Sequence, residues 1–340
     1  MARKIILPAL LFIIIVIIFF AWKIAGPATS FNGEKYFLFI KTGSHFEDVV
    51  QILQKDNVIK SPDIFSFVAS QLKLPEKLKA GKYEIKKGTS IISIVRALRN
   101  GRQSPVQLVI TKLRTKEDFA RFAGRQLECD SVAIINYLNN IDSLQYPELD
   151  SSNVMTAIIP NTYTFFWNTT ADKLFSKLYS EMYKFWNTER LKKADSLALT
   201  PKQVYILASV IEEETNKYDE MPVMASVYLN RLSRRMPLGA DPTIKFATRN
   251  FAAKRVTLKM ISESAGSPYN TYRNTGLPPG PICTPSIKTI DATLNAKTTS
   301  YLFFCAKPDF SGYHAFAATD AEHFRNARAY QKALDSLRIK

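Results

Sequence analysis

The feature that most constrains the fold of this chain is an apolar run that ends in three consecutive glutamates. Val204–Ile211 is apolar around almost the whole circumference of a helix, so it predicts a helix buried in a core. Glu212, Glu213 and Glu214 follow directly. At about 100° per residue the three carboxylates point to different sides of the helix, and at least one should lie against apolar neighbours.

A buried glutamate would matter for chemistry. Desolvation disfavours the charged form of a carboxyl group and raises its pKa above the usual value of about 4.3. A glutamate that keeps its proton near neutral pH can deliver it to the leaving oxygen of a glycosidic bond. The alternative is three solvated glutamates at a helix end, which a charge run alone favours. Helical geometry does not choose among the three.

The N-terminal segment predicts a membrane anchor. Ile5–Trp22 is 22 − 5 + 1 = 18 residues without a charge, and Arg3 and Lys4 precede it. This length lies at the low end of the roughly 17 to 25 residues that span a bilayer, and the preceding basic residues favour a cytoplasmic N-terminus. We therefore predict a single-pass helix in the cytoplasmic (inner) membrane, with the rest facing outward to the periplasm. A cleaved signal peptide, whose apolar region is usually about 7 to 15 residues, is the alternative.

The charge balance favours an acidic partner. The chain has 46 Lys and Arg against 30 Asp and Glu, a formal net charge of +16. Nucleic acid, anionic lipid and an acidic wall polymer would each satisfy this preference, but export argues against nucleic acid. Cys129, Cys283 and Cys305 form neither a disulfide framework nor a zinc-ligand pattern, which leaves one bridge or small buried side chains. We predict chemistry without a metal or cofactor.

A repeat occupies the region after the predicted anchor. Ile40–Ser44 matches Ile85–Thr89 with an offset of 85 − 40 = 45, and apolar residues at helical spacing follow Ser44 and Thr89. Each copy predicts a strand, a glycine turn and an amphipathic helix. The pattern resembles the start of LysM domains, which bind N-acetylglucosamine-containing polymers. A small packing unit that holds another domain off the membrane is the alternative.

The motifs around and after the glutamates resemble those of one family. They are, in order, Ala208–Thr215, Asn230–Leu232, Asp241–Thr243, Tyr269–Tyr272 and Gly276–Ile282. Each is weak alone, but their order over more than a hundred residues resembles the MltG/YceG family of endolytic murein transglycosylases. The resemblance extends over essentially the whole predicted exported chain.

The resemblance implies an activity and a catalytic residue. Glu212 matches the family's catalytic glutamate, the first one after the Ala-Ser-aliphatic-aliphatic run. It would first protonate the glycosidic oxygen between MurNAc and GlcNAc, then act as base while the muramic acid C6 hydroxyl closes onto C1. The product is a 1,6-anhydroMurNAc end, and cleavage would limit glycan strand length during wall synthesis. Peptidoglycan strands are then the substrate, with peptidoglycan synthases as candidate partners.

A second set of residues is predicted to line the sugar cleft. It comprises Asn230, Asp241, Thr243, Asn270, Tyr272 and His314, and buried hydrogen-bonding roles are the alternative for these side chains. Asp241 is either an orienting carboxylate or part of a structural turn. Two positions depart from the family pattern: Gly239 stands where Gln is expected, and Ser286 where Gly is expected. The missing amide at position 239 favours, as an alternative function, a non-catalytic peptidoglycan-binding scaffold.

Together these patterns predict an α+β protein in four parts. Residues 1–30 would form a cytoplasmic tip and transmembrane anchor, residues 31–105 a LysM-like α+β region, residues 106–155 a mainly helical connector, and residues 156–340 a mixed α+β catalytic domain. An aromatic-rich segment, Ile159–Trp167, would belong to the core of that domain or provide an exposed surface for stacking on sugar rings.

Overall fold

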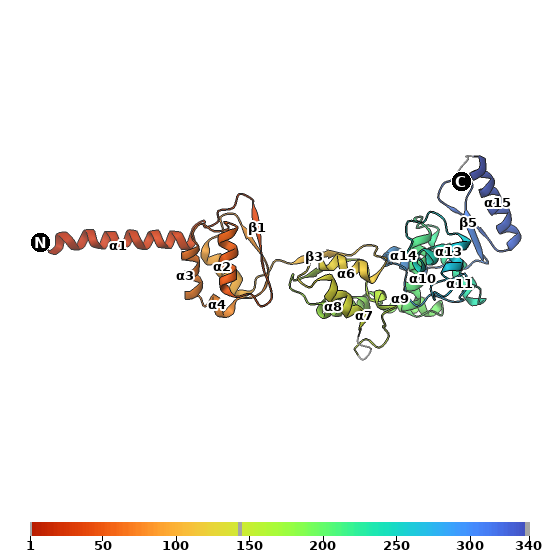
Figure 1. Ribbon diagram of the computed structural model, residues 1–340, viewed down its shortest axis with the longest axis horizontal. Coiled ribbons are helices and arrows are strands. Elements are labelled where there is room, and N and C mark those ends of the chain that lie inside the picture. The colour runs from red at the N-terminus through yellow and green to blue at the C-terminus, as the bar shows by residue number, and fades with distance from the viewer. Residues whose placement is uncertain (1, 142–144, 337–340) are drawn as a thin grey trace. The chain divides into compact units, whose positions relative to one another are not determined.

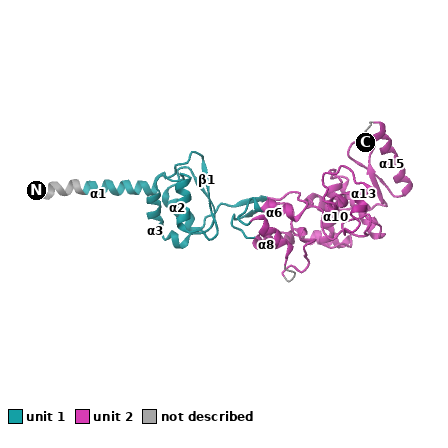
Figure 2. Cartoon of the chain, viewed as in Figure 1, with its two compact units in different colours: residues 1–108, 124–129, 164–170 teal, residues 109–123, 130–163, 171–340 magenta. Residues whose placement is uncertain are grey.

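The computed structural model describes residues 2–141 and 145–336, with side chains from Leu10 onward, and has a mixed α+β fold (Figure 1). Within these ranges the strands pair into three two-stranded sheets. The chain divides into two compact units (Figure 2). Unit 1 contains residues 1–108, 124–129 and 164–170, and unit 2 contains residues 109–123, 130–163 and 171–340. The α+β prediction is confirmed.

The first helix, α1 (Ala2–Ala25), covers the segment predicted as a membrane span. The side chains of residues 5–9 of that segment lie outside those that the structure describes. Large apolar side chains from Leu10 to Trp22 are exposed. Among the described residues, no helix is both long and apolar enough to cross a bilayer.

Unit 1 continues with two strands and four helices. They are β1 (Lys35–Ile40), α2 (Phe46–Lys55), α3 (Pro62–Gln71), α4 (Leu74–Lys77), β2 (Gly81–Lys86) and α5 (Ile91–Asn100). The two strands are antiparallel, with Lys35 opposite Lys86 and Ile40 opposite Gly81. The two copies of the repeat therefore meet through their strands.

The predicted repeat forms as two strand, turn and helix copies. Gly43 and Gly88 adopt φ angles of +85° and +81°, a region that glycine enters without steric penalty. Both helices begin one residue later than predicted, since their N-caps are His45 and Ser90 rather than Ser44 and Thr89. The offset of 90 − 45 = 45 residues is kept.

The apolar spacing of the repeat builds the core of unit 1. Val49 and Leu53 on α2, and Ile94 and Leu98 on α5, pack with strand residues such as Leu38. All five side chains are at most 2% exposed. Residues three and four apart share one helix face, so each helix buries one side against the sheet.

Two small strands and several helices follow. β3 (Val106–Val109) pairs with β4 (Thr162–Phe165) in the second sheet. The first elements of unit 2 are α6 (Lys116–Gly124), α7 (Ser131–Asn139), the 3-10 helix η1 (Val154–Ala157), α8 (Ala171–Phe185) and α9 (Thr188–Ser196). The predicted connector, residues 106–155, thus contains β3, α6, α7 and the start of η1, and its residues are divided between the two units.

The rest of unit 2 surrounds one central helix, α10 (Pro201–Glu214). The elements that follow it are α11 (Met221–Ser233), α12 (Asp241–Ala247), α13 (Leu258–Glu263), α14 (Ile287–Leu294), β5 (Phe303–Ala306), β6 (His314–Ala317) and α15 (Asp320–Ser336). Helix α10 contacts α9, α11, α12 and α14. Every residue of Val204–Ile211 is buried, which confirms the prediction of a buried helix.

Local sequence fixes where this central helix begins. The Thr200 hydroxyl accepts the Gln203 backbone N–H at 3.2 Å, and the Gln203 side chain accepts the Thr200 N–H at 2.8 Å. This reciprocal capping box satisfies two backbone donors that the first helical turn leaves unpaired, and Pro201 suits the first turn. The register of α10, and with it the position of its C-terminal glutamates, is therefore set from its start.

Candidate functional site

Glu212 contacts the beginning of α14. Its Oε2 accepts hydrogen bonds from the Ser286 N–H at 3.2 Å, from the Ser286 hydroxyl at 3.1 Å and from the Thr289 hydroxyl. Ser286 is the N-cap of α14, where the helix dipole favours a negative charge. Glu212 therefore fastens α10 to α14. Ser286, which stands where the family pattern has Gly, therefore contacts the predicted catalytic residue directly.

Glu213 lies between two basic side chains. Lys112 Nζ and Arg114 Nη2 each lie 3.1 Å from one of its carboxylate oxygens. Arg114 also lies over the Phe251 ring, 5.1 Å from its centroid. Because both carboxylate oxygens already face cations, this glutamate anchors the segment before α6 to the central helix.

Glu214 lines a large cavity. The cavity has a volume of about 620 Å³, and it is lined by Glu214, Arg231, Gly239, Asp241, Tyr272 and His323 together with aromatic and apolar side chains. Burial raises the pKa of Glu214 to about 7, and the negative charge of Asp241 adds to the rise. The Tyr228 hydroxyl donates to Glu214 Oε1 at 2.7 Å and opposes it by stabilising the carboxylate. Glu214 therefore has the properties of a general acid near neutral pH.

The three glutamates thus point to three sides of α10, as the helical geometry predicts. They reach α14, the basic pair at positions 112 and 114, and Tyr228 on α11. The expectation that one carboxyl would have a raised pKa is also confirmed, and it falls on Glu214. The assignment of catalysis to Glu212 stays a prediction.

Two of the predicted substrate-binding residues meet in the Glu214 cavity. The Tyr272 hydroxyl donates to Asp241 Oδ1 at 2.5 Å. Burial, and then this hydrogen bond, raise the pKa of Tyr272, so its hydroxyl keeps its proton and remains a donor. Tyr272 is still 38% exposed, which leaves its ring available to a ligand.

Gly239, the first departure from the family pattern, lies in the wall of the same cavity. Its φ angle is +59°, a left-handed conformation that glycine adopts most readily. A Cβ atom here would lie 3.2 Å from Arg231 Nη1. The position therefore faces the cavity, and the loss of a sugar contact stays a prediction.

The Asn230 side chain makes hydrogen bonds within unit 2. Its Nδ2 donates to the carbonyl oxygens of Thr299 and Tyr301 at 2.8 and 2.9 Å, which fixes the segment before β5 to α11. His314 is likewise paired, because its backbone N–H and its Nδ1 lie 2.7 and 3.1 Å from the two carboxylate oxygens of the buried Glu220. Both side chains hold unit 2 together.

Thr243 and Asn270 are buried beside Asp241 and Tyr272. Both side chains are 0% exposed. The Thr243 hydroxyl lies 2.8 Å from that of Thr271, and Asn270 Oδ1 accepts the Tyr272 N–H at 3.1 Å. These side chains position the two cavity residues, and direct contact with sugar stays a prediction for them.

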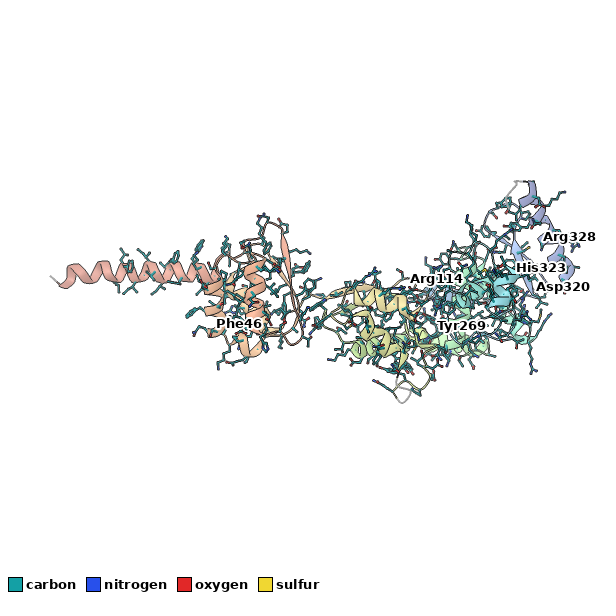
Figure 3. The ribbon with its side chains drawn as sticks, viewed as in Figure 1. Phe46, Arg114, Tyr269, Asp320, His323 and Arg328 are labelled. Atoms are coloured by element: carbon teal, nitrogen blue, oxygen red, sulfur yellow. The ribbon has the colours of Figure 1, made fainter. Side chains whose placement is uncertain are left out.

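Three ionisable side chains of the cavity were not among the predicted site residues: Glu214, Arg231 and His323. Arg231 stands inside one of the family motifs, and its Nε donates to the Leu302 carbonyl at 2.6 Å. His323, labelled in Figure 3, stacks on the Phe303 ring with centroids 5.1 Å apart. Burial, and then the charge of Arg231, lower the pKa of His323. One indication of Glu214 was present in the sequence, because the helical wheel places its carboxylate on a different side of the helix from that of Glu212.

A carboxyl group that keeps its proton near pH 7, with a second carboxylate nearby in an aromatic-walled cavity, is typical of enzymes that cleave glycosidic bonds. The profile of the YceG-like family matches residues 38–329. The chain therefore belongs to the YceG-like family, as its motifs indicate.

Relatives agree with this membership. The chain is 28% identical over 311 residues to the endolytic murein transglycosylase of Bacillus subtilis (strain 168), which covers 86% of this chain and 83% of that protein. It is 29% identical over 332 residues to the protein of the same name from Streptococcus pneumoniae (strain ATCC BAA-255 / R6), covering 87% of this chain and 58% of that protein. A crystal structure of a putative YceG-like protein from Listeria monocytogenes superposes with a TM-score of 0.57 at 26% identity, over 86% of this chain and 98% of that one.

The buried carboxyl predicts an unusual dependence of stability on pH. Because burial raises the pKa of Glu214 to about 7, folding stabilises its protonated form. The contribution is present below the unfolded pKa of about 4.3 and is lost as pH rises through 7, a fall of roughly 3 to 4 kcal/mol. Glu214→Gln should remove this fall, so that its melting temperature exceeds that of the parent at pH 8 but not at pH 4.

Glu212→Gln is the matched control, measured by the same thermal denaturation series. It replaces an acceptor of three hydrogen bonds at a helix N-terminus with an amide, so it should lower the melting temperature at pH 8. A Glu214→Gln variant that is less stable than the parent at pH 8 would contradict the raised pKa of Glu214.

Proposed function

We propose that this chain is an endolytic lytic transglycosylase that cleaves the bond between MurNAc and GlcNAc in peptidoglycan strands, with Glu214 as acid and base. Membership of the YceG-like family and two relatives named endolytic murein transglycosylase support the reaction. The observation that carries the assignment of the residue is the pKa of about 7 at Glu214, in a cavity large enough for a sugar chain.

The geometry accounts for both halves of this reaction. Protonated Glu214 gives its proton to the glycosidic oxygen as the bond to C1 breaks. The carboxylate that remains keeps the 2.7 Å hydrogen bond from Tyr228. It then takes the proton of the muramic acid C6 hydroxyl while that oxygen bonds to C1, which closes the 1,6-anhydro ring and restores the acid. No water is consumed, and one carboxyl group serves both steps.

Asp241 supports the positive charge that develops at C1. Its negative charge already acts on Glu214, and its Oδ1 is fixed by Tyr272 at 2.5 Å. A carboxylate held in place before the reaction stabilises an oxocarbenium-like transition state without having to reorganise. We therefore assign Asp241 and Tyr272 to the site, beside Glu214.

Glutamine variants of the two glutamates distinguish this proposal from the sequence-based assignment of Glu212. The full chain is incubated with glycan strands, and the products are analysed by mass spectrometry. The parent should release anhydro-ended fragments, and Glu214→Gln should slow their release by about 10² to 10⁴, the usual contribution of a general acid and base. Glu212→Gln should stay within about tenfold of the parent, because Glu212 holds α14.

Each other outcome has a definite meaning. Loss of cleavage in Glu212→Gln, with Glu214→Gln active and both variants folded, would establish the first glutamate as the catalyst. Reducing ends would mean hydrolysis, with Asp241 as the second carboxylate. Strands that the parent binds but leaves intact would favour a peptidoglycan-binding scaffold.

The pH profile tests the role of Tyr228. An acid with a pKa of about 7 must be protonated to act, so kcat/KM should fall as pH rises through about 7. Tyr228→Phe removes a donor to the carboxylate, which should raise the pKa of Glu214 and move the falling limb to higher pH. Tyr205→Phe is the control, because that equally buried hydroxyl donates to the Ile158 carbonyl instead. If Tyr205→Phe shifts the falling limb of the pH profile and Tyr228→Phe does not, the assignment of Glu214 as the acid is contradicted.

We further propose that α1 anchors the chain as a single pass in the cytoplasmic membrane, with the residues after α1 facing outward to the periplasm. The uncharged stretch Ile5–Trp22 and the exposed apolar side chains from Leu10 onward support this. A LysM-like role of unit 1 in holding glycan is supported by its paired strand, glycine turn and helix copies. In this position the enzyme would meet nascent strands and the synthases that make them.

Charged substitutions in α1 test the anchor. An arginine at the bilayer centre costs about 2.5 to 3.5 kcal/mol on insertion scales. Ile14→Arg with Ile18→Arg should therefore move the full chain from floating lipid vesicles to the soluble fraction in a density gradient. Ile14→Leu with Ile18→Leu keeps the apolar surface and should float like the parent. Equal flotation of the arginine variant would exclude insertion of this segment.

A further inference from the structure

A second cavity in unit 2 lies at the other end of α12 from the Glu214 cavity. It has a volume of about 530 Å³. Its lining includes Arg114, Lys116, Asp150, Phe246, Arg249 and Tyr269, of which Arg114 and Tyr269 are labelled in Figure 3. The proposed cleavage reaction uses none of these side chains.

The charged groups of this cavity suit a ligand that carries both signs of charge. Three cationic side chains face it, with Glu117 and Asp150 as acidic neighbours. Lys116 is held by the Ser151 hydroxyl at 2.5 Å, and Asp150 accepts the Ser152 N–H at 2.7 Å. Two carboxylates in the wall would repel a simple anion, so the cavity is better suited to a ligand with both signs of charge.

Arg249 is the cation best placed to take a ligand carboxylate. Its guanidinium lies 4.9 Å from the centroid of the Phe246 ring, which holds it in position. Among the described residues its side chain makes no hydrogen bond or ion pair, whereas Arg114 is already paired with Glu213. An unpaired guanidinium stacked on an aromatic ring can bind a carboxylate through two parallel hydrogen bonds.

The two large cavities lie at the two ends of α12. A small cavity of about 70 Å³ lies beside this helix and is lined by residues that include Arg114, Glu213, Pro242 and Phe246. Arg114 and Phe246 also line the second cavity, while Asp241, next to Pro242, lines the Glu214 cavity. At about 1.5 Å per helical residue, the step from Asp241 to Arg249 is on the order of 10 Å.

We propose that this second cavity binds the peptide stem of a muramic acid residue whose sugar lies in the Glu214 cavity. The inference rests on the proposed function, because only a peptidoglycan substrate brings such a stem. The stem carries free carboxylates and the amine of a diamino acid, which match the cationic and acidic sides of the cavity. Three extended peptide residues span about 10 Å, enough to follow α12 from one cavity to the other.

The test compares two substrates that differ only in the stem. One is peptide-bearing glycan, and the other is the same glycan after an amidase has removed the peptides, which leaves the lactyl carboxylate. The full-length parent should show a higher kcat/KM on peptide-bearing strands. Arg249→Gln should lower that value about tenfold while changing the value for peptide-free strands less than twofold, so the preference disappears.

Controls separate the possible failures. Lys254→Gln removes one exposed positive charge elsewhere in unit 2 and should keep the preference, and Arg249→Lys should retain part of it. Equal activity of the parent on both substrates, or an equal fall on both in Arg249→Gln, would overturn the stem site. A parent that cuts neither substrate would refute the proposed function instead.

Discussion

The site depends on the burial of α10 on every side. Helices α9, α11, α12 and α14 contact it, and Val204–Ile211 are buried without exception. A helix that is apolar all round and enclosed by four others cannot rotate without exposing apolar surface or opening cavities. Its orientation is therefore fixed, and its last three residues are held in three different directions.

Three identical side chains in succession acquire different properties from this arrangement. Glu212 meets hydroxyl and N–H donors at a helix start, Glu213 meets two cations, and Glu214 meets a buried tyrosine and the field of Asp241. Burial, with a second negative charge nearby, favours the neutral form of Glu214. The division into structural and acid roles follows from the neighbours that each direction supplies.

Local and periodic features could be read from the sequence because neighbouring residues determine them. The buried helix, the repeat in unit 1 and the three directions of the glutamates follow from spacing along a helix. Which glutamate has the raised pKa depends on burial by side chains that lie elsewhere in the sequence, on the opposing hydrogen bond from Tyr228 and on the charge of Asp241. A motif likewise does not reveal whether its polar side chain faces a cavity or a core, as Asn270 and Tyr272 differ within one segment.

Buried polar residues support the side chains that line the Glu214 cavity. Thr243, Asn270 and Thr271 are at most 1% exposed, and their side chains hydrogen-bond to one another or to the backbone beside Asp241 and Tyr272. Breaking one of these bonds would leave a buried polar group unpaired, at about 1 to 3 kcal/mol. That penalty holds Asp241 and Tyr272 in place before substrate arrives. Transition-state stabilisation requires such preorganisation, because groups that move during the reaction lose part of the energy that they provide.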